Sequence, residues 1–366
     1  MKILTCIAFT LLLSFGFLSN GFAQQKTENL IVITLDGFRW QEFYGGLDSA
    51  LMNNKEFTEH PNEMKAELWA ATPEERRAKL LPFFWGTFAK QGQLHGNRRY
   101  GSKVNNANRY WFSYPGYNEI FTGYPDTIIN SNDKFDNPNE NVLEFLNKQP
   151  GFQGKVAAFT SWDVFPYILN EKRSGVLVNS AWEDLTQGQL NDRIRYLNEI
   201  QHEAPELIGG VRWDFLTWQF ATEYLKENHP RVLYIGLDET DDMAHEGKYD
   251  HYIAAAHKAD KWIGQLWQQL QSDPFYKGKT TLLVTTDHGR GDADKKTWKD
   301  HGQKVPDCNQ IWFAVMWPDT RALGEVKMEE QLWQQQFAAT MAAFLGFDFK
   351  AEHEVASKAP VVLQKP

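Results

Sequence analysis

Residues 30–37, Leu-Ile-Val-Ile-Thr-Leu-Asp-Gly, form a run of apolar and β-branched residues that ends in an acid and a glycine. A short run of this kind, bounded by turn residues, predicts a buried β-strand. Four similar runs follow, at 156–159, 232–237, 281–285 and 311–316. Helical patterns occur between and after them, at 139–147, 212–226, 249–271 and 329–345. Strands that alternate with helices predict an α/β fold, with a mostly parallel central sheet and helices on both faces.

The segment after the first strand departs from this pattern. Residues 48–108 are rich in charged and amide side chains, with helical stretches predicted at 63–69 and 74–81 and a Gly/Asn/Arg-rich tail. We interpret them as an insertion or lid that lies over the sheet, within a single domain spanning residues 24–366. A surface subdomain with no role at the functional site would have the same composition, so both interpretations stay open at this point.

The first residues have the composition of an export signal. Lys2 precedes an apolar run that extends to about Leu18, and the small-residue site Gly21-Phe22-Ala23 follows. This order predicts a signal peptide cleaved near Ala23, and therefore an exported protein that is periplasmic or secreted. The apolar run is shorter than the ~20 residues that a membrane span needs, so we expect no retained membrane span.

Composition limits the stabilising forces and the partners. Without residues 1–23, Cys308 is the single cysteine, so stability must come from the core and any bound metal, with no intramolecular disulfide. The formal charge is −9, and no Lys/Arg run is long enough to follow a phosphate backbone. We therefore expect a small-molecule partner and no nucleic-acid binding surface, while the oligomeric state stays open.

Acids and histidines follow two of the predicted strands. Asp36 comes directly after the first strand, and Asp241 and His245 follow the strand at 232–237 with a spacing of four. Ligands gather beyond the carboxyl ends of strands in an open α/β sheet, and side chains four apart on a helix share one face. Asp241 and His245 could therefore bind one cation together.

Asp287 and His288 follow the predicted strand at 281–285, and Gly289 allows a sharp turn after them. His301 lies in a second His-Gly pair shortly after them. A lone histidine is usually a satisfied polar residue. Acid and histidine groups at several strand ends together predict a metal site.

Ser113 begins the string Ser-Tyr-Pro-Gly-Tyr-Asn-Glu-Ile-Phe-Thr-Gly. Pro115 favours the first turn of a helix that runs to about Phe121, and Gly123 is its expected stop. A hydroxyl at a helix N-terminus faces free N–H groups and the positive end of the helix dipole, which stabilise an alkoxide and a bound phosphate. Simple N-capping by serine would explain the same position.

In their order along the chain, these motifs resemble the alkaline phosphatase superfamily, and most of all its type I phosphodiesterase/nucleotide pyrophosphatase branch. The motifs are Asp-Gly-Phe-Arg at 36–39, the serine-led turn at 113–123, Asp-x-x-x-His at 241–245, Asp-His-Gly at 287–289 and His-Gly at 301–302. The resemblance spans residues 30 to about 318. It implies a metal-dependent hydrolase of phosphate esters that acts through a phosphoseryl intermediate.

The resemblance also implies a ligand set. One divalent ion would be held by Asp241, His245 and His301, and the other by Asp36, Asp287, His288 and the oxygen of Ser113. Two such ions about 4 Å apart can clamp both sides of an in-line displacement, with Ser113 as the nucleophile. Oxygen and imidazole ligands without thiolate suit zinc, and manganese is also compatible.

Substrate ligands are less sharply implied. The family has an asparagine that contacts phosphate shortly after the nucleophile helix, and Asn130 and Asn132 compete for this role, with Asn130 preferred. A monoester dianion calls for extra cations, whereas a diester needs an apolar or aromatic pocket. The candidate cations are Arg39, which we assign to substrate binding, and Arg173, Arg290 and Lys299, for each of which a surface role is the default. The resemblance alone favours diester or pyrophosphate cleavage.

Other functions compete with this one. Ser-Tyr-Pro at 113–115 is similar to the start of the Cys/Ser-x-Pro-x-Arg signature of sulfatases, but Tyr117 stands where the arginine belongs. Cofactor-independent phosphoglycerate mutases need a large second domain and a cytoplasmic location. The alternatives that stay are a phosphomonoesterase, a sulfatase-like hydrolase and a non-catalytic exported binding protein of the same fold. The binding protein would be expected to have lost a ligand, whereas all seven candidates are present.

Overall fold

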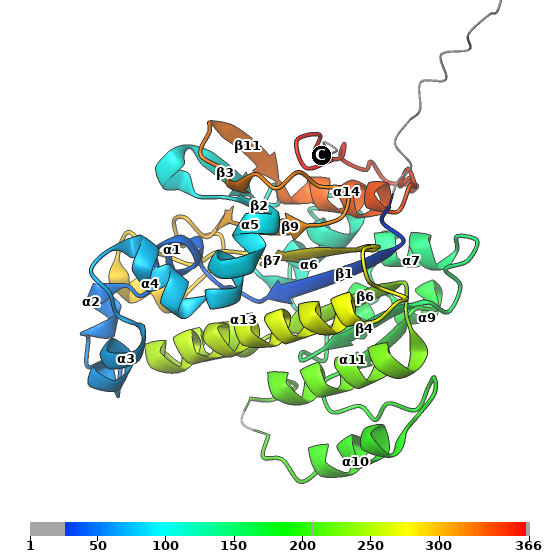
Figure 1. Cartoon of the computed structure of the whole chain (residues 1–366), viewed down its shortest axis with the longest axis horizontal. Helices are drawn as coiled ribbons and strands as arrows, with labels where there is room; N and C mark the ends of the chain where they lie inside the picture. Colours follow the sequence, from blue (N-terminus) through cyan, green and yellow to red (C-terminus); the bar gives the residue numbers. More distant parts are fainter. Residues whose placement is uncertain (1–25, 207, 364–366) are drawn as a thin grey trace, which may run out of the picture.

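The computed structural model describes residues 26–206 and 208–363, so the predicted signal peptide lies outside the described residues. The central strand is β1 (Asn29–Leu35), every residue of which is buried. It pairs in parallel with β6 (Val232–Leu237) on one side and with β7 (Thr280–Thr285) on the other. An almost unbroken apolar run is what a strand covered on both faces requires, and β1 lies in the middle of the molecule (Figure 1).

The main sheet has eight strands in the order β10-β2-β9-β7-β1-β6-β4-β5. Beyond β6 it continues in parallel through β4 (Val156–Thr160) and β5 (Leu177–Ser180). Beyond β7 it continues through β9 (Phe313–Met316), β2 (Gly92–His95) and β10 (Gly324–Glu325). Within this sheet only β9 runs against the other strands. The prediction of a mostly parallel central sheet is confirmed.

Helices cover both faces of this sheet because side chains along a strand alternate between its two faces. Ile31 and Ile33 of β1 belong to one buried apolar cluster, and Leu30 and Val32 belong to the other. Figure 1 shows α13 and α11 below the sheet and α14 above it. The first cluster includes residues of α11 (Asp214–Asn228) and α13 (Tyr249–Ser272), and the second includes residues of α6 (Ser113–Thr122), α7 (Val142–Asn147) and α14 (Phe337–Phe344).

A second sheet of three strands, called the small sheet below, has the order β11-β3-β8. It consists of β11 (Glu330–Trp333), β3 (Ser102–Asn105) and β8 (Gln310–Ile311). β11 and β3 are parallel, and Asn105 at the end of β3 lies opposite Trp333 at the end of β11. β8 pairs with β3 in the antiparallel sense. The residues that follow β3 and β11 therefore leave the small sheet side by side.

Two predicted elements differ from the structure. The predicted strand at 311–316 is divided at Trp312, because β8 joins the small sheet and β9 joins the main one. The predicted helix at 329–345 is wrong in its first half, where β11 and a single turn of 3-10 helix (Gln334–Gln336) precede α14. Pairing with β3 overrides the helical propensity of this glutamate- and glutamine-rich stretch.

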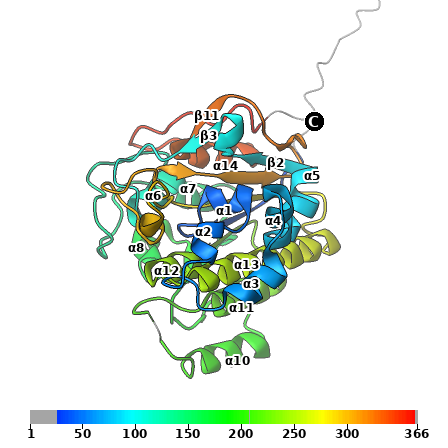
Figure 2. The same ribbon diagram turned by 90° about the vertical axis from the view of Figure 1, so that its left-hand side faces the viewer.

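The segment 48–108 is partly as expected. The helices α3 (Pro61–Leu68) and α4 (Pro73–Leu80) confirm the two predicted helical stretches, and α4 begins with a capping box between Thr72 and Glu75. Figure 2 shows α1 to α4 together on one side of the molecule. In contrast to our expectation, the end of the segment does not lie over the sheet. It contributes β2 to the main sheet and β3 to the small sheet.

Among the described residues, no helix is both long and apolar enough to cross a membrane.

The remaining helical elements are connectors. The connectors are α1 (Trp40–Gly45), α2 (Ser49–Met52), a π-helical turn (Phe84–Phe88), α5 (Ala89–Gln91), a 3-10 turn (Arg98–Tyr100), α8 (Phe165–Ile168), α9 (Glu171–Ser174), α10 (Asp192–Gln201), α12 (Glu239–His245) and a 3-10 turn (Lys295–Lys299).

Candidate metal and phosphoester site

The carboxyl ends of β1, β6 and β7 meet at one edge of the main sheet, because these strands are parallel neighbours. Asp36 follows β1, and Asp287 lies two residues beyond β7. The helix α12 follows β6 and carries Asp241 and His245, so the helical spacing on which their pairing depends is present. The fold thus brings side chains from three separate parts of the chain to one place.

Asp36 and Asp287 form a buried group with His288. One oxygen of each carboxylate accepts a hydrogen bond, Asp36 Oδ2 from the Tyr117 hydroxyl at 2.9 Å and Asp287 Oδ1 from the N–H of Gly37 at 3.1 Å. The other two oxygens are buried without a hydrogen-bond partner, and each lies 3.4 Å from Nε2 of His288. Unpartnered buried carboxylate oxygens are costly. A divalent cation between them and the imidazole would satisfy both, so these residues fit a metal.

His288 is oriented for such a role. Its Nδ1 donates to the carbonyl oxygen of Gly289 at 2.9 Å, which leaves the lone pair of Nε2 facing the carboxylates. Burial lowers the pKa of His288, but the carboxylates of Asp287 and Asp36 outweigh it and raise this pKa to about 9. Burial and the charge of Asp36 raise the pKa of Asp287 to about 8. Protons and metal ions would therefore compete for the same atoms.

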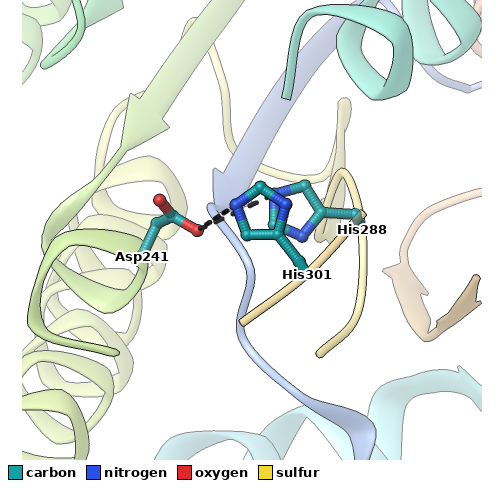
Figure 3. A group of neighbouring side chains, drawn as sticks. All are labelled: Asp241, His288 and His301. Carbon is teal, nitrogen blue, oxygen red and sulfur yellow. Dashed lines mark ion pairs between the residues drawn. The ribbon is translucent and has the colours of Figure 1, made fainter. Parts of the chain in front are cut away.

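A second group of donors lies beside the first. His245 Nε2 is 3.1 Å from Asp241 Oδ2 and 2.8 Å from His301 Nε2. Burial, followed by the nearby charge of His288, lowers the pKa of both His245 and His301, which favours the neutral imidazole that binds metals. Figure 3 shows the rings of His288 and His301 next to each other and facing Asp241; their centroids are 4.0 Å apart. His288 therefore lies between the two groups.

Arg290 connects the second group to its surroundings. Its guanidinium is buried, contacts the Asp241 carboxylate, and donates to the carbonyl oxygens of Asp241 at 3.2 Å and Lys299 at 2.6 Å. This contact ties α12 to the segment that precedes His301. Arg290 thus lies beside the candidate ligands, in contrast to the surface role taken as its default.

Ser113 is the first residue of α6, and the helix ends at Gly123, whose φ of 70° confirms the predicted stop. The buried hydroxyl of Ser113 lies 3.5 Å from His288 Nε2. The N–H of Tyr114 is capped by another residue, because Asn132 Oδ1 accepts from it at 2.9 Å. Ser113 therefore does not serve as a simple N-cap, and its hydroxyl faces the donor groups.

The two candidate asparagines lie in different environments. Both side chains are exposed, but Asn132 accepts a hydrogen bond from the N–H of Tyr114 in the first turn of α6. The spacing along the sequence favoured Asn130. The structure brings Asn132 to the nucleophile helix, so Asn132 is the better candidate for contact with a phosphate.

The assignment of Arg39 to substrate binding needs correction. Its side chain is fully buried, pairs with Glu42 and donates to the carbonyl oxygen of Gly291 at 2.9 Å. The chain turns into α1 directly after Arg39, and the guanidinium is enclosed beneath that turn, where a substrate cannot reach it. Arg173 is likewise occupied, by the Glu144 carboxylate at 2.8 Å.

Two features of the site were not predicted from the sequence. Tyr117, which the sequence marks only as a departure from sulfatases, donates to Asp36; its spacing of four from Ser113 on one helix was the available indication. The start of α12 is fixed by a reciprocal cap. Asp214 accepts from the N–H groups of Asp238 and Glu239, and Glu239 accepts from the N–H of Asp214. No local pattern indicates a contact between residues so far apart.

Comparisons with solved structures agree with the fold. The alkaline phosphatase PafA is 11% identical with a TM-score of 0.61, and the match covers 92% of this chain and 99% of that one. The lipoteichoic acid synthase LtaP from Listeria monocytogenes is 14% identical with a TM-score of 0.59, covering 93% and 77%. Murine ectonucleotide pyrophosphatase/phosphodiesterase 5, solved with AMP, is 13% identical with a TM-score of 0.52, covering 91% and 97%. At these identities the likeness shows the fold alone.

A search of curated proteins found no match. The comparison with family models is more specific than the comparison with solved structures. The family model described as type I phosphodiesterase / nucleotide pyrophosphatase matches residues 30–340, which include both donor groups and Ser113. This family consists of hydrolytic enzymes that act on phosphoesters. Because the match covers most of the chain, the protein belongs to the type I phosphodiesterase/nucleotide pyrophosphatase family.

Proposed function

We propose that this protein is an exported hydrolase of phosphate esters that uses two divalent ions, zinc in the first instance, and Ser113 as its nucleophile. One ion binds Asp36, Asp287, His288 and Ser113, and the other binds Asp241, His245 and His301. One observation carries the proposal. Two unpartnered carboxylate oxygens surround His288 Nε2, which lies 3.5 Å from the Ser113 hydroxyl. The export part rests on the composition of residues 1–23.

The chemistry follows from the residues around Ser113. Divalent ions, when bound, lower the pKa of a coordinated hydroxyl and neutralise charge on a phosphoryl group. Ser113 Oγ loses its proton and attacks phosphorus, the bond to the ester oxygen breaks, and the leaving group departs with the electron pair. Water then hydrolyses the phosphoserine and restores the hydroxyl. The N-terminus of α6 favours negative charge at this point, and Asn132, held on Tyr114 N–H, offers its amide N–H₂ to a phosphoryl oxygen.

Diester or pyrophosphate cleavage is the favoured reaction. Family membership supports it, and so does the position of the candidate cations. Arg39 and Arg173 are bound to glutamates, and Arg290 contacts Asp241. Lys299 is left as a candidate for binding a monoester dianion. Its side chain lies close to Gly247, two residues after His245. A phosphomonoesterase is therefore the second candidate.

The test is a comparison of rates on p-nitrophenyl phosphate and bis-p-nitrophenyl phosphate, with the zinc-loaded chain from residue 24 onward. We expect the diester to have the higher kcat/KM. A strong preference for the monoester would reverse the choice between the two candidates. A protein that binds no metal and hydrolyses neither compound would be a non-catalytic member of the family.

The nucleophile is tested by Ser113→Ala. We expect kcat to fall by ~10³-fold or more, because covalent attack is lost, while zinc content changes little since the carboxylates and imidazoles stay. Ser272→Ala is the matched control, because this exposed hydroxyl at the end of α13 donates only to its own helix. Near-normal turnover of Ser113→Ala would mean that water attacks the ester directly.

A further inference from the structure

The small sheet holds the backbone on which Asp287 and His288 are placed. Asn106, which follows β3, donates through Nδ2 to the carbonyl oxygen of Asp287 at 2.6 Å. Gln334, which follows β11, donates through Nε2 to the same carbonyl at 2.8 Å. The two amides also bind each other, Asn106 Nδ2 to Gln334 Oε1 at 2.6 Å. Two neighbouring strand ends thus fix one carbonyl behind the donor groups.

The same two strand ends are bound by one carboxylate of the nucleophile helix. Glu119 lies on α6 with an exposed fraction of 0%. Its Oε1 accepts from the N–H groups of Ala107 at 2.7 Å and Gln335 at 2.9 Å. Its Oε2 accepts from both the N–H and the Nδ2 of Asn108, each at 2.8 Å. Glu119 therefore attaches α6 to the segments that leave both β3 and β11.

Asn108 carries this attachment to the turn before the nucleophile. Its Oδ1 accepts from the N–H groups of Tyr110 and Trp111, each at 3.0 Å. Trp111 has a φ of 54°, a left-handed conformation that is strained for a bulky residue and persists only where the surroundings enforce it. Phe112, the next residue, is the N-cap of α6 and has no side-chain hydrogen bond. The turn that leads into α6 is thus held from Glu119 through Asn108, in addition to the Asn132 side chain that accepts from the N–H of Tyr114.

We propose that Glu119 is a positioning residue for Ser113, which it acts on through Asn108 and the strained turn at Trp111. This inference rests on the proposed function, in which Ser113 is the nucleophile. Glu119 connects α6, which carries Ser113, to the small sheet. The pair Asn106–Gln334 connects the backbone of Asp287 to the same sheet. Hydrogen bonds outside the donor groups then set the distance between the Ser113 hydroxyl and His288. Reacting groups need this kind of support, because small displacements lower the rate.

Glu119→Gln tests this role. In either orientation of the new amide, two of the four donors face an N–H₂ group in place of an oxygen. We expect kcat to fall by about 10- to 100-fold through misplacement of Ser113, with KM and zinc content within about threefold of the original values. Amide hydrogen exchange at Tyr110 and Trp111 should accelerate.

A double variant and a control separate positioning from general stability. In Glu119→Gln/Asn108→Asp, the Asp carboxylate can accept from the Gln amide and still accept from Tyr110 and Trp111, so kcat should recover by about tenfold over Glu119→Gln alone. Glu144→Gln alters a carboxylate of α7 that is 1% exposed and paired with Arg173. We expect this control to lower the melting temperature and leave kcat unchanged.

The outcomes are distinguishable from those for the nucleophile. If Ser113→Ala is inactive but Glu119→Gln keeps its kcat, the positioning role is refuted and the proposed function stands. If Ser113→Ala is active, the nucleophile itself is wrong. Should Glu119→Gln fail to fold, Asn108→Ala removes the side-chain link to Tyr110 and Trp111 and leaves Glu119 its three backbone donors. A normal kcat in that variant would likewise overturn the inference.

Discussion

The helix α6 approaches the backbone of Asp287 closely at Gly116. A Cβ at this position would be 2.6 Å from the carbonyl oxygen of Asp287, whereas ordinary contact begins at 3.4 Å. The variant Gly116→Ala therefore needs a separation of about 0.8 Å (3.4 minus 2.6). The carbonyl cannot retreat easily, because Asn106 and Gln334 hold it from the other side. We expect α6 to move, and Ser113 with it.

The expected loss of activity is larger than the loss of stability. Displacement of a reacting group by about 1 Å costs ~100-fold in rate, so kcat should fall by about that factor. Overpacking costs roughly 1–3 kcal/mol, and the higher helix propensity of alanine offsets about 1 kcal/mol of it. The melting temperature should therefore change by only a few degrees.

The assay compares kcat on the better p-nitrophenyl ester, zinc content and melting temperature. Gly86→Ala is the matched control, because Gly86 lies in the helical turn Phe84–Phe88 and a Cβ there meets nothing within 4 Å. This control should keep its kcat and its stability. If Gly116→Ala keeps the original kcat and zinc content, the contact between α6 and Asp287 does not set the position of Ser113.

Two further predictions concern stability. Burial raises the pKa of Asp260 to about 6 while its carboxylate accepts from the N–H groups of Phe83 and Phe84. The folded state then holds this proton more tightly than the unfolded state, so its contribution is full below about pH 3.8 and is lost as the pH rises to about 6. The free energy of unfolding should change by on the order of 3 kcal/mol over this pH range. In Asp260→Asn, the free energy measured by urea unfolding should depend less on pH, and an unchanged pH dependence would contradict the prediction. Arg77→Met should cost about 3 kcal/mol, because the largely buried Glu325 carboxylate loses the guanidinium bound at 2.6 Å and keeps only the Asn97 amide and the exposed Lys327. Glu325→Gln in the same chain should recover part of this loss, and a cost under about 1 kcal/mol for Arg77→Met would show that the pair is solvated.

The parts of the fold that local patterns describe could be predicted from the sequence. The strand 232–237 has the predicted bounds, because its apolar pattern depends on neighbouring residues alone. The end of α6 at Gly123 follows from the freedom of glycine to adopt a positive φ. Strand ends in a parallel sheet share one edge, which is why the residues after several strands could be expected to lie together, whereas their division into two ligand sets came from the family resemblance.

Contacts between distant parts of the chain could not be predicted in this way. β11 was taken for helix because its strand character comes from pairing with β3, which lies 228 residues earlier by the register of Glu330 and Ser102. The position of Arg39 depends on the course of α1 and on Glu42, not on its motif. Asn132 was ranked below Asn130 because spacing along a loop does not show which side chain turns toward Tyr114.

The location of the small sheet in the chain has a consequence for truncated forms of this protein. Every candidate ligand lies at or before His301, so a chain ending near residue 305 would keep all of them. It would lack β9, β10 and α14 as well as β8 and β11, and with them the amide of Gln334 and the N–H of Gln335 that hold Asp287 and Glu119. Such a fragment would contain the residues for catalysis without the support that orients them. On the proposed function, we expect the site to become competent only after β11 has folded against β3, a segment made more than two hundred residues earlier.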